Sequence, residues 1–121
     1  MTYSGTGKTY ASAMRELGFQ KVLFLVHRNQ IAKQAQKSFR KVFSGQVSMG
    51  LVTGKYQEYD KDFIFATIQT LSKEENLHRY EKNTFDAIVI DEAHHSSANS
   101  YKKVLDYFEP KLWLGMTATP D

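Results

Sequence analysis

Short apolar runs and amphipathic stretches alternate along the chain. Residues 22–26, 62–66, 86–90 and 112–116 are largely apolar and are bounded by polar residues, which is typical of strands covered on both faces in a parallel sheet. The segment 46–52 alternates weakly between apolar and polar residues, and Thr53 and Gly54 mark a turn after it. The pattern therefore predicts short buried strands, with a weaker strand signal at 46–52.

Helices are predicted between these strands. Residues 8–17 are small or helix-tolerant, and Gly18 is placed to cap the C-terminus of that helix. In 28–43 apolar residues recur at helical spacing and basic residues occupy other positions around the axis; the apolar set is Ile31, Ala35, Phe39 and Val42, and the basic set is Lys33, Lys37, Arg40 and Lys41. Further helices are expected at 67–80 and around 101–108, the latter after the capping residues 97–100 and before Pro110.

Strands that alternate with helices predict parallel pairing and a three-layer α/β fold with ligands at the carboxyl ends of the strands. The 121 residues suit one domain over 1–121.

With 41% hydrophobic residues and no cysteine, the composition excludes disorder, a disulfide scaffold and a cysteine-ligated metal site. No apolar run approaches the roughly 20 residues of a membrane span, and the N-terminus lacks the apolar core of a secretory signal, so a cytoplasmic protein is expected. The net charge of +3 permits nucleic-acid binding without arguing for it.

The first chemical motif is Ser4, Gly5, Thr6, Gly7, Lys8 and Thr9. Its small residues let backbone N–H groups turn inward around phosphate oxygens, and the helix that follows favours anions at its N-terminus. Lys8 can reach the β and γ phosphates of a nucleotide, and the Thr9 hydroxyl can ligate Mg²⁺. Thr2 holds the first glycine position of the pattern G-x-x-x-x-G-K-[ST], so a flexible Gly–Lys turn remains the alternative.

An acidic pair, Asp91 and Glu92, follows the predicted strand at 86–90. A nucleotide needs a carboxylate on a neighbouring strand to hold Mg²⁺, which suits Asp91, and Glu92 is placed to orient and deprotonate an attacking water. A metal cluster with His94 and His95 is the alternative, although the spacing is not that of the i, i+4 histidine pair of a zinc helix.

Two hydroxyls, those of Thr117 and Thr119, follow the last predicted strand in the segment GMTATP. They are expected at the same edge of the sheet as Asp91, where they could hydrogen-bond the acidic motif. In isolation, a strand end and a proline-terminated turn explain these residues equally well.

In this order the segments SGTGKT, DEAHH and MTATP resemble motifs I, II and III of the superfamily 2 helicases and translocases. Residues 26–31 (VHRNQI) resemble motif Ia, and 66–71 (ATIQTL) resemble the nucleic-acid-contacting block that follows it. The stretches FLVHRNQIAKQA, DEAHHSSANSY and GMTATP are most similar to the type III restriction (Res subunit) branch, whose members are double-strand DNA translocases or helicases. The resemblance covers essentially the whole chain and implies the first RecA-like domain of a P-loop NTPase.

The resemblance also implies ATP and Mg²⁺ as cofactors and assigns residue roles. The nucleotide would be held by Ser4, Gly5, Thr6, Gly7, Lys8 and Thr9. Thr9 and Asp91 would hold Mg²⁺, partly through water, and Lys8, Asp91 and Glu92 would form the catalytic set. Thr117 and Thr119 would couple the state of ATP to the grip on nucleic acid, whose backbone Arg28, Thr67 and Gln69 would contact. A solvated Arg28 and a surface amide at Gln69 are alternatives, and the basic set in 28–43 is interpreted as a solvated face.

The chain starts within motif I and ends just after motif III, so a fragment is expected, without the P-loop strand or the second RecA-like domain of the family. That second domain supplies an arginine finger, so little turnover is expected from the chain alone. Family topology places 112–116 beside the P-loop strand, which predicts an exposed strand edge and self-association.

Duplex DNA is the favoured partner. A non-catalytic nucleotide- or nucleic-acid-binding module and a small-molecule P-loop kinase remain other classes of function.

Overall fold

One parallel sheet organises the computed structural model, which describes residues 14–43, 45–91 and 98–116. The strand order is β2-β3-β1-β4-β5, and every pairing is parallel. The strands are β1 (Val22–Val26), β2 (Met49–Val52), β3 (Phe63–Thr67), β4 (Ala87–Asp91) and β5 (Leu112–Met116). β1 and β5 lie where they were predicted. β3 and β4 begin and end one residue later than predicted, so the polar residues Thr67 and Asp91 are the last residues of their strands.

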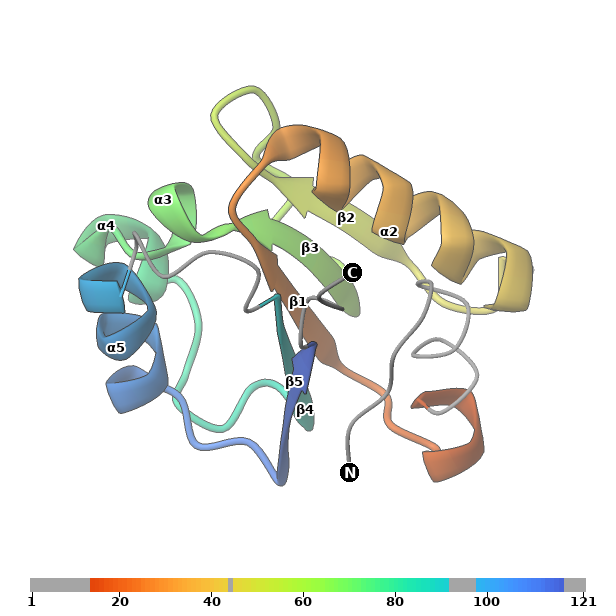
Figure 1. Ribbon diagram of the computed structural model, residues 1–121. Helices are drawn as coiled ribbons and strands as arrows, with labels where there is room; N and C mark the ends of the chain where they lie inside the picture. Colours follow the sequence, from red (N-terminus) through yellow and green to blue (C-terminus); the bar gives the residue numbers. More distant parts are fainter. Residues whose placement is uncertain (1–13, 44, 92–97, 117–121) are drawn as a thin grey trace, which may run out of the picture.

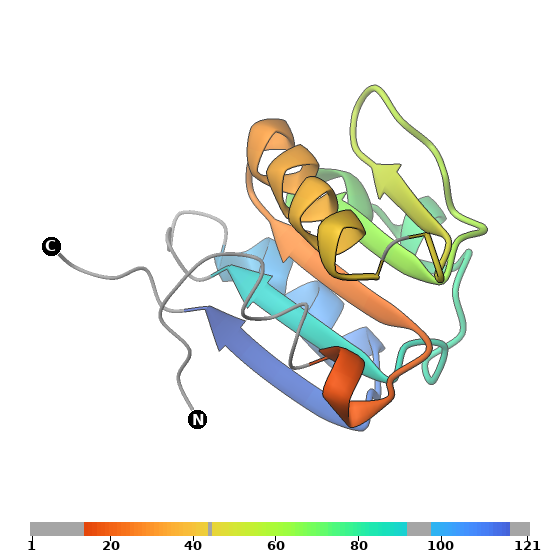
Figure 2. The same ribbon diagram turned by 90° about the vertical axis from the view of Figure 1, so that its right-hand side faces the viewer.

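Helices cover both faces of this sheet (Figure 1). α2 (Asn29–Phe43) packs on one face, and α3 (Ile68–Leu71), α4 (Glu74–Leu77) and α5 (Ala98–Tyr107) lie over the other. Figure 2 shows α2 in front of the strands and α5 behind them. This arrangement confirms the three-layer α/β fold. Within the described ranges, no helix has the length and apolarity needed to cross a membrane.

The layer between α2 and the sheet is an aromatic core. Alternate residues of β1 point to opposite faces, which sends Phe24 toward α2 and its neighbours Leu23 and Leu25 toward the other helices. Phe39 of α2 is fully buried, and its ring centroid lies 5.1 to 6.1 Å from the rings of Phe24, Phe43, Phe63 and Phe65. The helical spacing of the apolar residues in 28–43 therefore marked the buried face of α2 correctly.

The single helix predicted over 67–80 was wrong. Thr67 belongs to β3, and the remainder forms two short helices separated at Ser72 and Lys73, where Lys73 is extended with φ −67° and ψ 134°. An unbroken helix, at about 100° per residue, would place Leu77 and Tyr80 well away from the face of Leu71. The break allows all three residues to be buried in the same core.

A glycine ends the first described helical turn, at residues 14–17, as predicted. Gly18 has a φ of +74°, and its N–H donates to the carbonyl of Met14 at 3.1 Å. This left-handed conformation favours glycine after a helix. The earlier part of the predicted 8–17 helix lies outside the described residues.

The two edges of the sheet differ. Residues 53–58 fold back over edge strand β2, where the N–H of Glu58 donates to the carbonyl of Leu51 at 3.0 Å and the N–H of Leu51 donates to Oε1 of Glu58 at 2.9 Å. Gly50 allows this close approach, because a Cβ there would lie 2.5 Å from the carbonyl oxygen of Glu58. Among the described residues β5 pairs only with β4, and no described segment pairs with its outer edge.

We predict that Phe39→Ala lowers the free energy of unfolding by about 3–5 kcal/mol, because it removes a ring that packs against four others and leaves a cavity. Urea unfolding followed by circular dichroism measures the loss. Leu17→Ala is the control: Leu17 is 57% exposed, and a change of about 0.5 kcal/mol or less is expected there. Equal losses in the two variants would contradict the assignment of the core.

Candidate functional site

The strands that precede several of the candidate segments end at the carboxyl edge of the sheet. Because all strands are parallel, the chain leaves every strand at the same edge. The register pairs Val26 with Thr67, and it pairs Asp91 with Met116. β1, β3, β4 and β5 therefore end at similar levels of the sheet, as the sequence predicted.

A hydrogen bond joins two of the predicted nucleic-acid-binding segments. Nε2 of Gln69, just after β3, donates to the carbonyl of His27, just after β1, at 3.0 Å. Arg28 is the next residue and is exposed, and its carbonyl accepts the N–H of Ala32 at 3.2 Å in the first turn of α2. The structure thus places Gln69 in contact with the residue that precedes Arg28, and both Arg28 and Gln69 are exposed.

Thr67 is placed differently from its two predicted companions. It is only 4% exposed, and its hydroxyl donates to Oγ1 of Thr70 at 2.8 Å. Its side chain is therefore buried and hydrogen-bonded to a side chain of α3, although it makes no capping bond to the backbone of that helix. The role of Thr67 toward nucleic acid stays a prediction.

Asn76 ties α3 to α4. Its Nδ2 donates to the carbonyl of Thr70 at 2.7 Å, and its Oδ1 accepts the hydroxyl of Tyr59 at 2.7 Å. The Arg79 guanidinium lies 4.4 Å from the centroid of the Tyr59 ring. Tyr59, Asn76 and Thr70 thus form a chain of hydrogen bonds that ends at the helix carrying Gln69.

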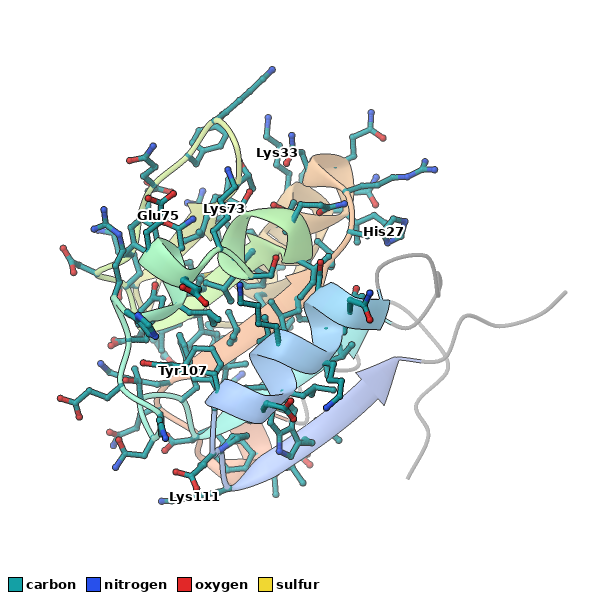
Figure 3. The ribbon with its side chains drawn as sticks, turned by 90° about the vertical axis from the view of Figure 1, so that its left-hand side faces the viewer. His27, Lys33, Lys73, Glu75, Tyr107 and Lys111 are labelled. Atoms are coloured by element: carbon teal, nitrogen blue, oxygen red, sulfur yellow. The ribbon has the colours of Figure 1, made fainter. Side chains whose placement is uncertain are left out.

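Burial shifts the pKa values of two tyrosines in this region, Tyr59 and Tyr80. It raises the pKa of Tyr59, although the nearby Arg79 guanidinium acts in the opposite direction. Burial also raises the pKa of Tyr80, whose hydroxyl donates to the carbonyl of Tyr59 at 2.9 Å. Lys73 and Glu75, by contrast, are exposed, and both are labelled in Figure 3.

All of the predicted nucleotide-binding residues lie outside the described ranges, and so do the predicted catalytic Glu92, the coupling threonines and the two histidines of the alternative metal cluster. This applies to Ser4, Gly5, Thr6, Gly7, Lys8, Thr9, Glu92, His94, His95, Thr117 and Thr119. Asp91 ends β4 at the carboxyl edge, in register with Met116 of β5. Its nucleotide and metal roles, like those of the residues beyond the described ranges, stay predictions.

Comparison with known proteins identifies the family. The family model described as "Type III restriction enzyme, res subunit" matches residues 2–121. The chain belongs to this family. As a Res-subunit family member it is a first RecA-like domain of the superfamily 2 helicase type, as its motifs predicted.

Individual relatives agree with the Res-subunit family. "Putative ATP-dependent helicase IRC3" of Saccharomyces cerevisiae is 44% identical over 91 residues, which cover 74% of this chain and 13% of that protein. "Type I restriction enzyme EcoAI endonuclease subunit" of Escherichia coli is 30% identical over 130 residues, which cover 97% of this chain and 16% of that protein. The chain thus spans a small part of each relative.

Solved structures confirm the fold of the Res-subunit domain. One is a crystal structure titled as a hypothetical ATP-dependent RNA helicase from Sulfolobus tokodaii. It superposes with a TM-score of 0.82 at 18% identity, and the match covers 98% of this chain and 40% of the helicase chain. Another is Saccharomyces cerevisiae Dbp5 bound to RNA and ADP BeF3. It superposes with a TM-score of 0.76 at 13% identity, and the match covers 100% of this chain and 36% of the Dbp5 chain.

Asn76 and Tyr59 lie outside the motifs of the family, and Thr70, although it belongs to the block 66–71, was given no supporting role by the sequence. Asn76 looked like an interior residue of one long helix. Ser72 followed by Glu75 has the spacing of a helix start, and this signal could have revealed the second helix, although the observed N-cap is Lys73 and makes no side-chain capping bond.

We predict that Asn76→Ala costs about 1–3 kcal/mol of unfolding free energy, because it leaves the carbonyl of Thr70 and the hydroxyl of Tyr59 without this partner. Hydrogen exchange should also accelerate at the amides of Ser72 and Leu77, which close α3 and α4. Asn83→Ala changes an exposed asparagine and is the control. Unchanged exchange in α3 and α4 would show that Asn76 does not hold them.

Proposed function

We propose that this domain binds Mg-ATP and nucleic acid, and that it forms the first RecA-like part of an ATP-hydrolysing DNA translocase or helicase. One observation carries the proposal: the strands that precede the acidic motif, motif III and both nucleic-acid blocks end at one edge of a single parallel sheet. In open α/β sheets, ligands bind at that edge.

The nucleotide would be held by this chain's own motif I residues. Backbone amides of Gly5 and Gly7 and the ammonium of Lys8 would bind the phosphates, while Thr9 and Asp91 would hold Mg²⁺. Bound Mg²⁺ neutralises charge that develops on the phosphates during transfer. Glu92 would orient the attacking water and accept its proton.

The nucleic-acid backbone would lie across Arg28 and Gln69. Support comes from their exposure and from the hydrogen bond between Gln69 and the carbonyl of His27, since a guanidinium and an amide are common donors to phosphate and sugar oxygens. Thr117 and Thr119 would link this grip to the state of ATP. Duplex DNA is the favoured substrate because the matching family is that of the type III restriction subunit.

A second RecA-like domain would complete the ATP site. The relatives are much longer than this chain, which covers 13% and 16% of them. An arginine finger from such a domain is worth about 10³–10⁵ in rate. The isolated chain would therefore bind nucleotide and hydrolyse it very slowly.

We predict weak Mg-ATP binding by the chain and almost no turnover, with or without duplex DNA. Equilibrium binding of a fluorescent ATP analogue and phosphate release measure the two properties. Lys8→Ala should weaken binding, because it removes the ammonium that pairs with the phosphates, whereas Lys111→Ala, at an 81% exposed side chain, should not.

DNA-stimulated turnover that Glu92→Gln abolishes would contradict the expected inactivity of the isolated chain and would support the role of Glu92. Nucleotide binding that never leads to hydrolysis, even beside the remaining domains, would instead favour a non-catalytic binding module. Absence of any nucleotide binding would overturn the proposal.

The open edge of β5 is proposed to pair with another strand. It is the end of the sheet that no described segment covers, and Trp113 on this strand is 37% exposed. We predict self-association of the isolated chain, visible as a rising mass with concentration in sedimentation. Leu114→Pro removes a backbone N–H within β5 and should reduce association; a clean monomer over a wide concentration range would contradict the pairing.

A further inference from the structure

A groove of about 550 Å³ lies between helix α2 and the segment 53–58 that covers β2. Its lining comprises Lys33, Gln36, Lys37, Arg40, Leu51, Tyr56 and Glu58. Lys33 belongs to the family-like stretch 24–35, but none of the lining residues was given a role in ligand binding, and the sequence pattern alone suggested a solvated face for the basic ones. The segment 53–58 turns that face into one wall of a groove.

The groove has a strong excess of positive charge. Lys33, Lys37 and Arg40 recur at i, i+4 and i+7, which places them along one side of α2. α2 contains no aspartate or glutamate, and no described residue forms an ion pair with Lys37 or Arg40. The one carboxylate in the lining, that of Glu58, accepts the N–H of Leu51.

An exposed aromatic ring completes the lining. Tyr56 is 38% exposed, and Nζ of Lys33 lies 5.2 Å from its ring centroid. Thr53, which is 2% exposed, holds the turn: its N–H donates to the carbonyl of Tyr56 at 2.9 Å, and its hydroxyl oxygen accepts the N–H of Tyr56 at 3.2 Å. The backbone of Tyr56 is thus fixed at this point of the turn before any ligand arrives, which lowers the entropic cost of binding.

We propose that this groove binds a single-stranded stretch of nucleic acid, with phosphates on Lys37 and Arg40 and a base stacked on Tyr56. Cations that follow a backbone and an aromatic ring that stacks a base are the combination by which proteins hold single strands. Lys33 and Arg40 are about 10 Å apart along the helix axis. A single strand that runs along this side of α2 can therefore place phosphates beside more than one of these cations.

The groove continues the interface described above and rests on the proposed function. α2 begins directly after Arg28, and Lys33 lies little more than one turn further along the same helix. Figure 3 shows Lys33 and His27 along the same upper edge of the molecule. A duplex held at Arg28 and Gln69 would therefore extend a flanking single strand into the groove.

Anisotropy of a labelled single-stranded oligonucleotide, measured with the full 121-residue chain over about 50–200 mM salt, tests the charges. The Lys37→Gln, Arg40→Gln double variant should bind more weakly, and the slope of log affinity against log salt should fall by about 1.4, at about 0.7 per lost phosphate contact. The Lys41→Gln, Lys82→Gln double variant removes the same charge from exposed sites outside the groove and should keep the wild-type slope.

Substitutions of Tyr56 test the stacking. Tyr56→Leu should lose about five-fold or more in affinity at an unchanged salt slope, whereas Tyr56→Phe keeps the ring and should bind as wild type does. Equal binding by the leucine and phenylalanine variants would overturn the stacking.

Arg28→Ala separates this proposal from the proposed function. If Arg28→Ala weakens binding and the Lys37, Arg40 double variant matches its control pair, the groove is not a nucleic-acid site and the proposed function stands. If the chain binds neither single-stranded nor duplex nucleic acid, both proposals fail.

Discussion

Parallel hydrogen bonding between the strands is the constraint on which the candidate site depends. It orients every strand in one direction, so segments that are distant in sequence leave the sheet at a common edge. Burial of alternate side chains on both faces then fixes the register, because a slip by one residue would move Phe24 to the face of Leu23 and Leu25. The contact between Gln69 and His27, the residue before Arg28, follows from that register.

The surroundings of the site are held by a second kind of interaction. Polar side chains form hydrogen bonds there with backbone groups that no regular helix or strand pairing satisfies. Where the helix after β3 breaks, the amide of Asn76 joins the two halves. Where β2 would be an open edge, the hydroxyl of Thr53 and the carboxylate of Glu58 fold the chain back over it. These residues have no part in the motifs, yet they position the surfaces that flank them.

Apolar runs and helical spacing were enough to predict the strands and α2, because burial on one or both faces is a local signal. The break at Ser72 and Lys73 could not be predicted in this way, since it depends on Leu77 and Tyr80 sharing a core with Leu71. The approach of Gln69 to the segment that carries Arg28 was predictable from parallel strand ends. The groove along α2 was not, because Tyr56 lies far from Lys37 in the sequence and approaches it only through the turn at Thr53.

The close packing around Gly50 leaves no room for a side chain at that position. A methyl group at that position would collide with the carbonyl oxygen of Glu58 and with Cγ of Lys61, and both belong to the segment that carries or follows Tyr56. Gly50, on edge strand β2, therefore sets how closely the segment 53–58 lies against the sheet. Gly50→Ala would therefore change the width of the groove between α2 and the segment 53–58 without altering any charge.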